Sequence, residues 1–147
     1  MTNAEQERKV FWQLFEQELK RQDNPFCIKH YKYFATINKH SAISNYCLSI
    51  DFLVKKQFLR VGIYMLDNIP SYEYMCLHKE EIEDLLGFNL KWVTEGEKNP
   101  NVRRIVLHIP FIVGDDNSYR DTINIAIEHI NKLIEVIPQY SPENIFD

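Results

Sequence analysis

Few side chains in this sequence have the types and spacing that catalysis requires. Metal-dependent cleavage of a phosphodiester needs two or three carboxylates around a divalent cation, with a lysine near the attacking water. Asp51 lies in a predicted strand, but the neighbouring predicted strand, residues 59–63, contains no carboxylate. Glu18 and Lys20 lie in a predicted helix, where residues two apart point in different directions. We therefore expect no metal and no nuclease site of this kind.

Nucleophilic catalysis is also unsupported. Cys76 and His78 are two residues apart in a predicted helix, which separates them by about 200° around the helix axis, so they cannot form a thiolate–imidazole pair. The sequence has no nucleophile elbow, no phosphate-binding glycine loop and no zinc-binding His-Glu-x-x-His motif. We predict no catalytic residues and no cofactor.

The most informative pattern is the strict alternation of apolar and polar residues in segments 46–52 and 59–65. Such alternation predicts two strands, and the four residues between them, 54–57, predict a hairpin. In this register Ile50 faces Val61, and Asp51 lies opposite Arg60. A slip of one residue would pair Ile50 with Arg60, so the apolar pattern favours the first register.

The polar side of this hairpin is a candidate ligand-binding surface. It comprises Ser49, Asp51, Arg60 and Tyr64, with Gly62 leaving space opposite Ser49. If helices cover the apolar side, these four residues face away from them. The alternative interpretation is an ordinary solvated sheet face, closed by an ion pair between Asp51 and Arg60.

Basic and aromatic residues gather in the first half of the predicted sheet. Between residues 25 and 66 there are six Lys or Arg against one Asp, a local charge of +5, whereas residues 67–101 carry eight acids against three lysines, a local charge of −5. Basic residues beside aromatic rings suit a phosphate backbone or single-stranded nucleic acid. Lysines at strand edges and turns also prevent aggregation, which is the alternative. The candidate nucleic-acid-binding residues are Lys29, Lys32, Tyr33, Lys39, Lys55 and Lys56.

The periodicity predicts an α+β fold that positions these residues. Apolar residues at helical spacing predict helices over residues 4–22, 72–86 and 118–137. Alternation of apolar and polar residues, and the turn residues that flank these segments, predict strands within 32–39, 46–53, 58–65, 89–94 and 102–109. We expect an antiparallel sheet of about five strands with three helices packed on one face, in the order α-β-β-β-α-β-β-α. Residues 1–147 are expected to form a single domain, with a core of about residues 4–140.

Composition limits the classes of function. The chain has 147 residues, of which 45% are hydrophobic and 26% charged, as in ordinary globular domains. Its net charge of −4 gives no overall attraction to nucleic acid, so any such binding needs a local patch. The sequence has no signal-peptide pattern and no apolar run of about 18 residues. We therefore expect a cytoplasmic protein with no membrane partner.

Several segments resemble one known family, the domain-of-unknown-function family 4268. The resemblance rests on residues 11–15, 24–26, 59–65 and 79–87, then on Leu90-Lys91-Trp92 and Arg104-Ile105, and spans roughly residues 10–140. Members of that family often form the carboxy-terminal part of bacterial proteins whose amino-terminal part is similar to restriction-endonuclease-like nucleases. The resemblance implies a role near restriction or defence, and it supplies no catalytic residues to carry over.

Three functional hypotheses follow from these observations. The first is a non-catalytic binding or accessory module of a restriction-like or nucleic-acid-handling system, whose partner is nucleic acid or a nuclease-like protein. The second is a protein-interaction or homo-oligomerisation domain that does not contact nucleic acid. The third is a degenerate or unrecognised hydrolase or nuclease, with its site around the sheet-face residues named above; such a site would need a deep pocket.

Overall fold

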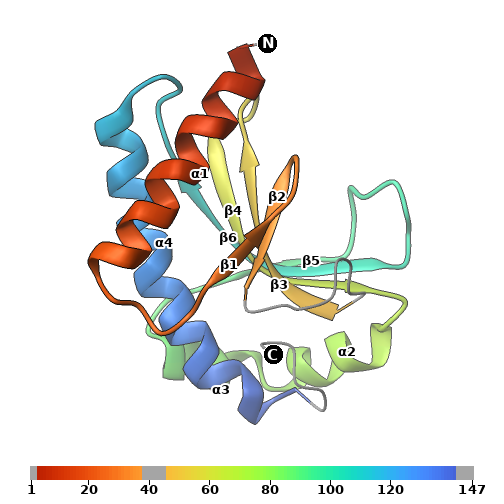
Figure 1. The fold of residues 1–147 in the computed structure, drawn as a ribbon. Coiled ribbons are helices and arrows are strands. Elements are labelled where there is room, and N and C mark those ends of the chain that lie inside the picture. The colour runs from red at the N-terminus through yellow and green to blue at the C-terminus, as the bar shows by residue number, and fades with distance from the viewer. Residues whose placement is uncertain (1–2, 38–45, 142–147) are drawn as a thin grey trace.

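The protein is built on a six-stranded antiparallel sheet (Figure 1). The computed structural model describes residues 3–37 and 46–141. The order of strands across the sheet is β1-β2-β3-β4-β6-β5. In chain order the strands are β1 (Ile28–His30), β2 (Phe34–Ile37), β3 (Tyr46–Leu53), β4 (Phe58–Leu66), β5 (Lys91–Val93) and β6 (Val102–Pro110).

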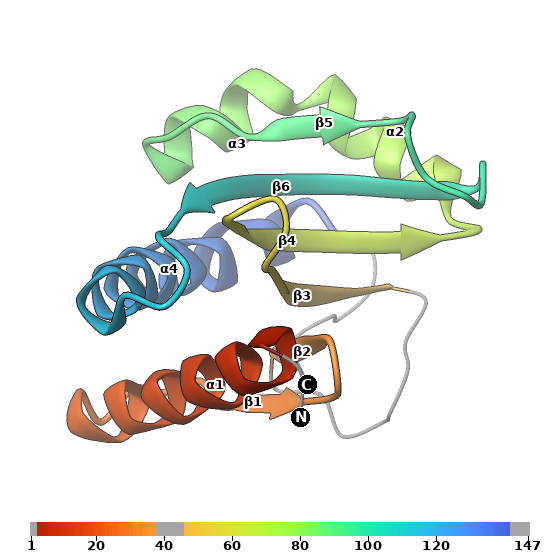
Figure 2. The ribbon, with the colours of Figure 1, turned by 90° about the horizontal axis from the view of Figure 1, so that it is seen from above.

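Four α-helices accompany the sheet: α1 (Asn3–Arg21), α2 (Ile69–Leu77), α3 (Lys79–Leu86) and α4 (Asp116–Val136), which runs into a 3₁₀ turn, η1 (Ile137–Gln139). Figures 1 and 2 show α1 and α4 side by side on one side of the sheet, with α2 and α3 near the β5 edge. No helix in the described ranges combines the length and apolar character needed to cross a bilayer. The six antiparallel strands and the four α-helices confirm the predicted α+β class with an antiparallel sheet.

The predicted hairpin register is confirmed along the whole of β3 and β4. Ile50 pairs with Val61 and Asp51 with Arg60, and the turn occupies residues 54–57. The inward positions of β4, from Leu59 to Met65, are fully buried. At roughly 1.5 to 3 kcal/mol for each large apolar side chain removed from water, this inward row is a principal reason for the register.

Aromatic packing connects α1, the sheet and α4. The Phe11 ring of α1 stacks on Phe52 of β3 with centroids 4.3 Å apart, and Phe52 stacks on Phe111 at 4.6 Å. Tyr119 of α4 completes the cluster, and its hydroxyl donates a hydrogen bond to Glu7 Oε1 at 2.6 Å. Burial, together with that hydrogen bond, raises the pKa of Tyr119 to about 12. The cluster fixes the first helix over the inner face.

Several predicted elements are wrong in number or extent. Of the strand predicted over 32–39, residues 34–37 form β2, and residues 38–39 lie outside the described residues. The sequence did not predict β1, which a tight turn joins to β2 through a 2.7 Å hydrogen bond from the Tyr31 N–H to the Phe34 carbonyl. The predicted helix 72–86 is two helices that meet at His78. The predicted strand 89–94 is only three residues long. The sheet thus has six strands rather than about five, and the described residues form four α-helices rather than three.

Gly62 permits β4 and β6 to approach each other closely. Its φ is +153°, and a Cβ at this position would lie 2.2 Å from the Ile105 carbonyl oxygen and 2.7 Å from the Val106 Cα. Both obstructing atoms are backbone, so no rotamer change can relieve the clash. By contrast, Gly96 has a φ of +87°, and a Cβ there would meet no other atom within 4 Å.

Gly62→Ala is expected to lower the free energy of unfolding by about 3 kcal/mol or more, since the methyl overpacks backbone atoms at the centre of the sheet. Gly96→Ala is the matched control and is expected to cost about 1 to 2 kcal/mol from its left-handed backbone alone. Urea unfolding of both variants measures the difference. Equal losses would contradict the close approach of β4 and β6.

Candidate functional site

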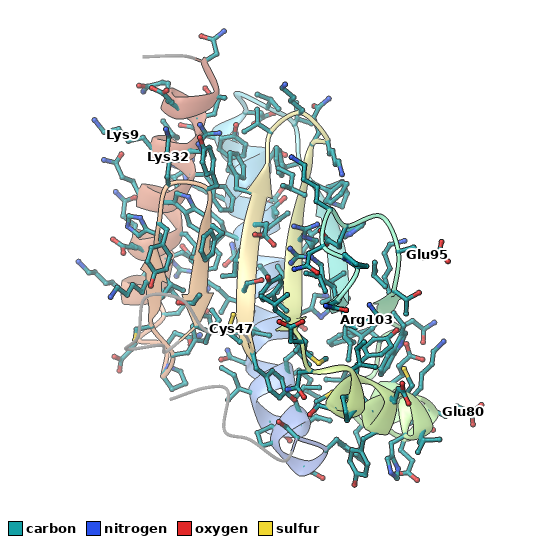
Figure 3. All side chains as sticks on the ribbon, turned by 90° about the vertical axis from the view of Figure 1, so that its right-hand side faces the viewer. Lys9, Lys32, Cys47, Glu80, Glu95 and Arg103 are labelled. Carbon is teal, nitrogen blue, oxygen red and sulfur yellow. The ribbon has the colours of Figure 1, made fainter. Side chains whose placement is uncertain are left out.

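The candidate sheet-face residues lie on the side of the sheet opposite α4. Figure 3 looks onto this face, with α4 behind the strands. The Arg60 Nε donates a hydrogen bond to Asp51 Oδ2 at 3.0 Å, so the predicted ion pair between these two residues is present. Their side chains are only 19% and 14% exposed. The pair is therefore partly shielded from water.

Arg104 of β6 extends this ion pair into a network that the sequence did not reveal. Its Nη1 lies 3.5 Å from Asp51 Oδ2, and its Nε donates to Glu97 Oε1 at 2.5 Å. Its guanidinium also lies over the Tyr64 ring, 4.8 Å from the centroid. These residues come from three strands and the loop between β5 and β6. The network ties the β5–β6 loop to the centre of the sheet.

The structure brings all four predicted sheet-face residues onto one face, but it does not make an open site of them. Ser49 is 5% exposed and pairs with Gly62 across the hairpin. Asp51 and Arg60 bond each other, and Tyr64 is covered on one side by Arg104. Their geometry fits the interpretation of an ion-paired sheet face, and a ligand-binding role for them stays a prediction.

Two of the predicted basic segments lie at the same end of the sheet. Strand β2 leads away from the turn that carries Lys32 and Tyr33, and the antiparallel β3 returns to the turn that carries Lys55 and Lys56. Figure 1 shows both turns toward the top of the view, and Figure 2 shows the β1–β2 turn next to the start of α1 and the β3–β4 turn over the middle of the sheet. All four side chains are exposed, and Tyr33 keeps 56% of its surface in contact with solvent. We call these four residues, with Arg8 described next, the basic end.

Arg8 belongs to this group, although its sequence position gave no direct indication of it. Its guanidinium lies over the Tyr33 ring at 4.8 Å from the centroid, and the Lys32 ammonium lies at 5.2 Å from the same centroid. The signal that could have found it is helical spacing: residues 8 and 12 are one turn apart, beside the apolar stripe of α1. The sequence alone does not show that this side of α1 lies against the β1–β2 turn, which is seen only in the tertiary structure.

The structure does not bring the remaining two basic-patch residues into this group. Lys29 is exposed on the edge strand β1. It is the middle residue of that strand and pairs with Thr36 of β2, so it lies away from the end of the sheet that carries the two turns. Lys39 lies outside the described residues. The predicted patch is therefore divided, and only its members in the two turns are brought together by the described part of the fold.

The pKa of His108 reflects its burial and the positive charges around it on this face of the sheet. It pairs with Arg60 across β4 and β6, and its ring stacks on Phe58 with centroids 4.0 Å apart. Burial, and then the positive charges of Lys91, Arg60 and Lys56, lower the pKa of His108. This side of the sheet therefore disfavours a further positive charge.

The described residues hold no group of three or more His, Cys, Asp or Glu side chains that could bind a metal ion. The acids that share the sheet face, Asp51 and Glu97, are each engaged by arginine. Such an arrangement can carry a structural ion-pair network, and it offers no carboxylate cluster to a cation.

Comparison with known proteins identifies a family. The family described as "Domain of unknown function (DUF4268)" matches residues 7–141. No curated protein and no solved structure matches the chain. The match covers every helix and strand except the first residues of α1.

The ion-pair network yields a test of how Asp51 is coupled to Arg60. Asp51→Asn is expected to lower the free energy of unfolding by about 1 to 3 kcal/mol, because two arginines lose their shared carboxylate in a partly buried place. In an Arg60→Met background the same change is expected to cost less, with a coupling energy of about 0.5 kcal/mol or more.

Glu135→Gln is the control, because Glu135 forms an exposed ion pair with Lys132 at 3.7 Å. Its loss is expected to cost about 0 to 1 kcal/mol. Strictly additive effects of the Asp51 and Arg60 changes in chemical denaturation would contradict the pairing described here.

Proposed function

The chain belongs to the DUF4268 family, and from that premise we propose that it is a non-catalytic module that binds the phosphate backbone of nucleic acid through its basic end. We further propose that the module acts within a restriction-like or other nucleic-acid-handling system, in which a nuclease-like protein would carry out the chemistry. The observation that carries it is that the two lysine-bearing turns lie at the same end of the sheet, with Arg8 against the Tyr33 ring of one of them.

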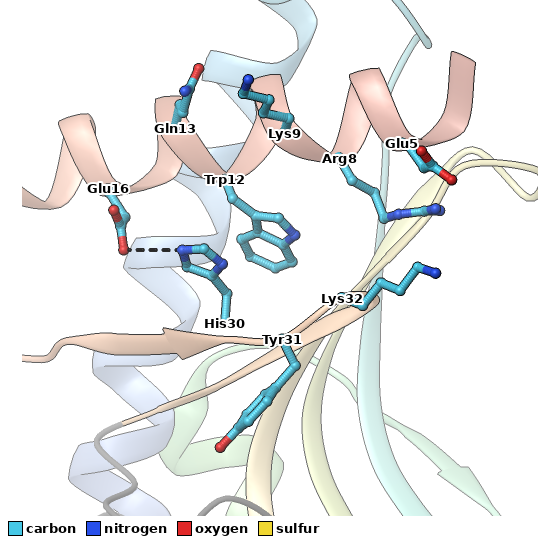
Figure 4. A pocket seen from close by; sticks show the side chains of 9 residues that line it. All are labelled: Glu5, Arg8, Lys9, Trp12, Gln13, Glu16, His30, Tyr31 and Lys32. Carbon is cyan, nitrogen blue, oxygen red and sulfur yellow. Dashed lines mark ion pairs between the residues drawn. The ribbon is translucent and has the colours of Figure 1, made fainter. Parts of the chain in front are cut away.

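Charge separation along the chain supports this assignment. Residues 25–66, which supply both turns, have a local charge of +5, although the whole chain is at −4. A cluster of exposed cations attracts phosphates and releases their counterions even when the protein as a whole is acidic. Glu5 is the acid that Figure 4 places beside Arg8 and Lys32, so one carboxylate there stands against two cations.

Tyr33 supplies a second element of recognition. Its ring is more than half exposed at the tip of a turn, beside two cations. An exposed aromatic ring beside cations is the arrangement on which an unstacked base packs, and such stacking tolerates any base. We therefore favour single strands over duplex as the ligand of the basic end.

A second candidate function is self-association, which one observation favours. Tyr74, Leu77 and Leu85 on α2 and α3 expose 46%, 83% and 47% of their surfaces. Apolar side chains exposed together on adjacent helices are typical of interaction surfaces. Figure 1 shows α2 and α3 at the opposite end of the molecule from the two turns of the basic end, so the two functions are compatible.

The nucleic-acid proposal predicts salt-sensitive binding of single-stranded oligothymidylate, measured by fluorescence anisotropy. Lys55→Ala together with Lys56→Ala is expected to weaken binding and to reduce the slope of log affinity against log salt by up to about 1.4, since two phosphate contacts are removed. Lys20→Ala together with Lys98→Ala removes the same charge from other parts of the chain and is expected to leave the slope unchanged. Absence of binding at low salt, or equal effects of the two pairs, would overturn the proposal.

The self-association candidate predicts a species larger than the monomer in sedimentation velocity at high protein concentration. Leu77→Ser with Leu85→Ser is expected to restore the monomer, because it removes the exposed apolar surface. Ile125→Ser, on α4 and 43% exposed in the native protein, is the control and is expected to have no effect. A monomer at every concentration counts against this candidate.

A further inference from the structure

A cleft of about 460 Å³ lies between the first half of α1 and the β1–β2 hairpin, next to the basic end. Figure 4 shows the nine residues that line it, which come from α1 on one side and from residues 30–32 on the other. This volume is within the range of small-ligand sites and suits a molecule of the size of one nucleotide.

The two ends of the cleft differ in charge and in how their groups are engaged. At one end, Glu16 Oε1 lies 3.5 Å from His30 Nε2, so its carboxylate already has a partner. At the other end, Figure 4 places Arg8 and Lys32 together with the carboxylate of Glu5. Lys9 also lines the cleft, but Figure 4 shows its ammonium directed away from this group, so the two cations of this end are Arg8 and Lys32. An anionic group is therefore favoured at the Arg8 end.

Trp12 presents an unsatisfied hydrogen-bond donor at this same end. The residue is only 4% exposed, and within the described residues its indole Nε1 is buried without a hydrogen-bond acceptor. Buried donors of this kind are rare, since nearly all find an acceptor in protein, water or ligand. The other tryptophan shows the usual outcome, because the Trp92 Nε1 donates to Glu83 Oε2 at 3.2 Å.

The orientation of the indole connects this donor with the cations. One face of the ring is occupied by His30, whose ring lies parallel to it at 6.0 Å between centroids. Figure 4 shows the indole nitrogen on the opposite edge, toward Arg8 and Lys32. A ligand reaches this nitrogen when the side chains around it move, and exposed side chains such as Lys32 change rotamer on a nanosecond scale.

We infer that the cleft between α1 and the β1–β2 hairpin receives one nucleotide of a bound single strand, with the phosphate at Arg8 and Lys32 and an oxygen acceptor of the nucleotide at the Trp12 indole N–H. This inference rests on the proposed function and deepens it. The basic end would hold the backbone of the strand, and the cleft would hold one of its units.

The test is a titration of the full, ¹⁵N-labelled chain followed through its two indole N–H resonances, which Trp12→Phe assigns by loss of one signal. Thymidine 5′-monophosphate is expected to shift the Trp12 resonance and to leave the Trp92 resonance in place. Inorganic phosphate and thymidine, at the same concentration, are the controls. A shift with inorganic phosphate as large as that with the nucleotide would overturn the assignment to a nucleotide, as would no shift at all.

Affinity for oligothymidylate gives the second readout. Trp12→Phe keeps an aromatic ring but removes the N–H, and it is expected to weaken binding about fivefold. Trp92→Phe is the matched control and is expected to leave the affinity unchanged. If Trp12→Phe fails to fold, Arg8→Gln, which alters a surface side chain, is expected to give a loss of similar size. Unchanged affinity in folded Trp12→Phe or Arg8→Gln would overturn the inference.

The two failures are distinguishable. If the oligonucleotide binds through Lys55 and Lys56 while the Trp12 resonance does not respond, the proposed function holds and the cleft inference fails. If the oligonucleotide does not bind at any salt concentration, the proposed function fails. In that case the inference fails with it, and a selective response of Trp12 to the mononucleotide would indicate a site for free mononucleotides instead.

Discussion

Burial of the inward row of β3 and β4 is the constraint on which the other features depend. Four apolar residues of β4, at alternate positions from Leu59 to Met65, are fully buried against the helices. Since side chains alternate across a strand, burying this row places Asp51 and Arg60 on the opposite face. A shift of one residue would expose the apolar row and bury both charges, which is costly unless they remain paired.

The same register sets where the basic turns lie. Antiparallel pairing of β2 with β3 and of β3 with β4 brings the turns before β2 and after β3 to one end of the sheet. The aromatic cluster of Phe11, Phe52 and Tyr119 then fixes α1 above that sheet, so that Arg8 meets Tyr33. Hydrophobic packing on one face thus assembles charged groups at one end, although no two of the segments involved are adjacent in sequence.

The sequence predicted the features that local periodicity controls. Alternation was enough to predict the β3–β4 register and the Asp51–Arg60 pair, because a hairpin with a short turn has few alternatives. It could not predict that Arg104 and Glu97 join the pair, since that depends on β6 lying beside β4 across a long connection. The break at His78 was also missed, because the apolar spacing continues through it and neither Gly nor Pro marks the junction.

The residues of the candidate site also fall into some that the sequence predicted and some that it did not. Lysines in the turns were recognisable from composition, whereas Arg8 and Trp12 looked like ordinary members of an amphipathic helix and acquire their roles only from what α1 faces. The indole N–H of Trp12, without an acceptor in the described residues, has no signature in sequence at all.

The central claim, that the β3–β4 register separates a buried apolar row from an outward charged row, can be measured directly by cross-strand proton NOEs. The account predicts contacts that place Ile50 opposite Val61 and Asp51 opposite Arg60. Contacts that place Ile50 opposite Arg60 would contradict it, and with it the arrangement of both hairpin turns.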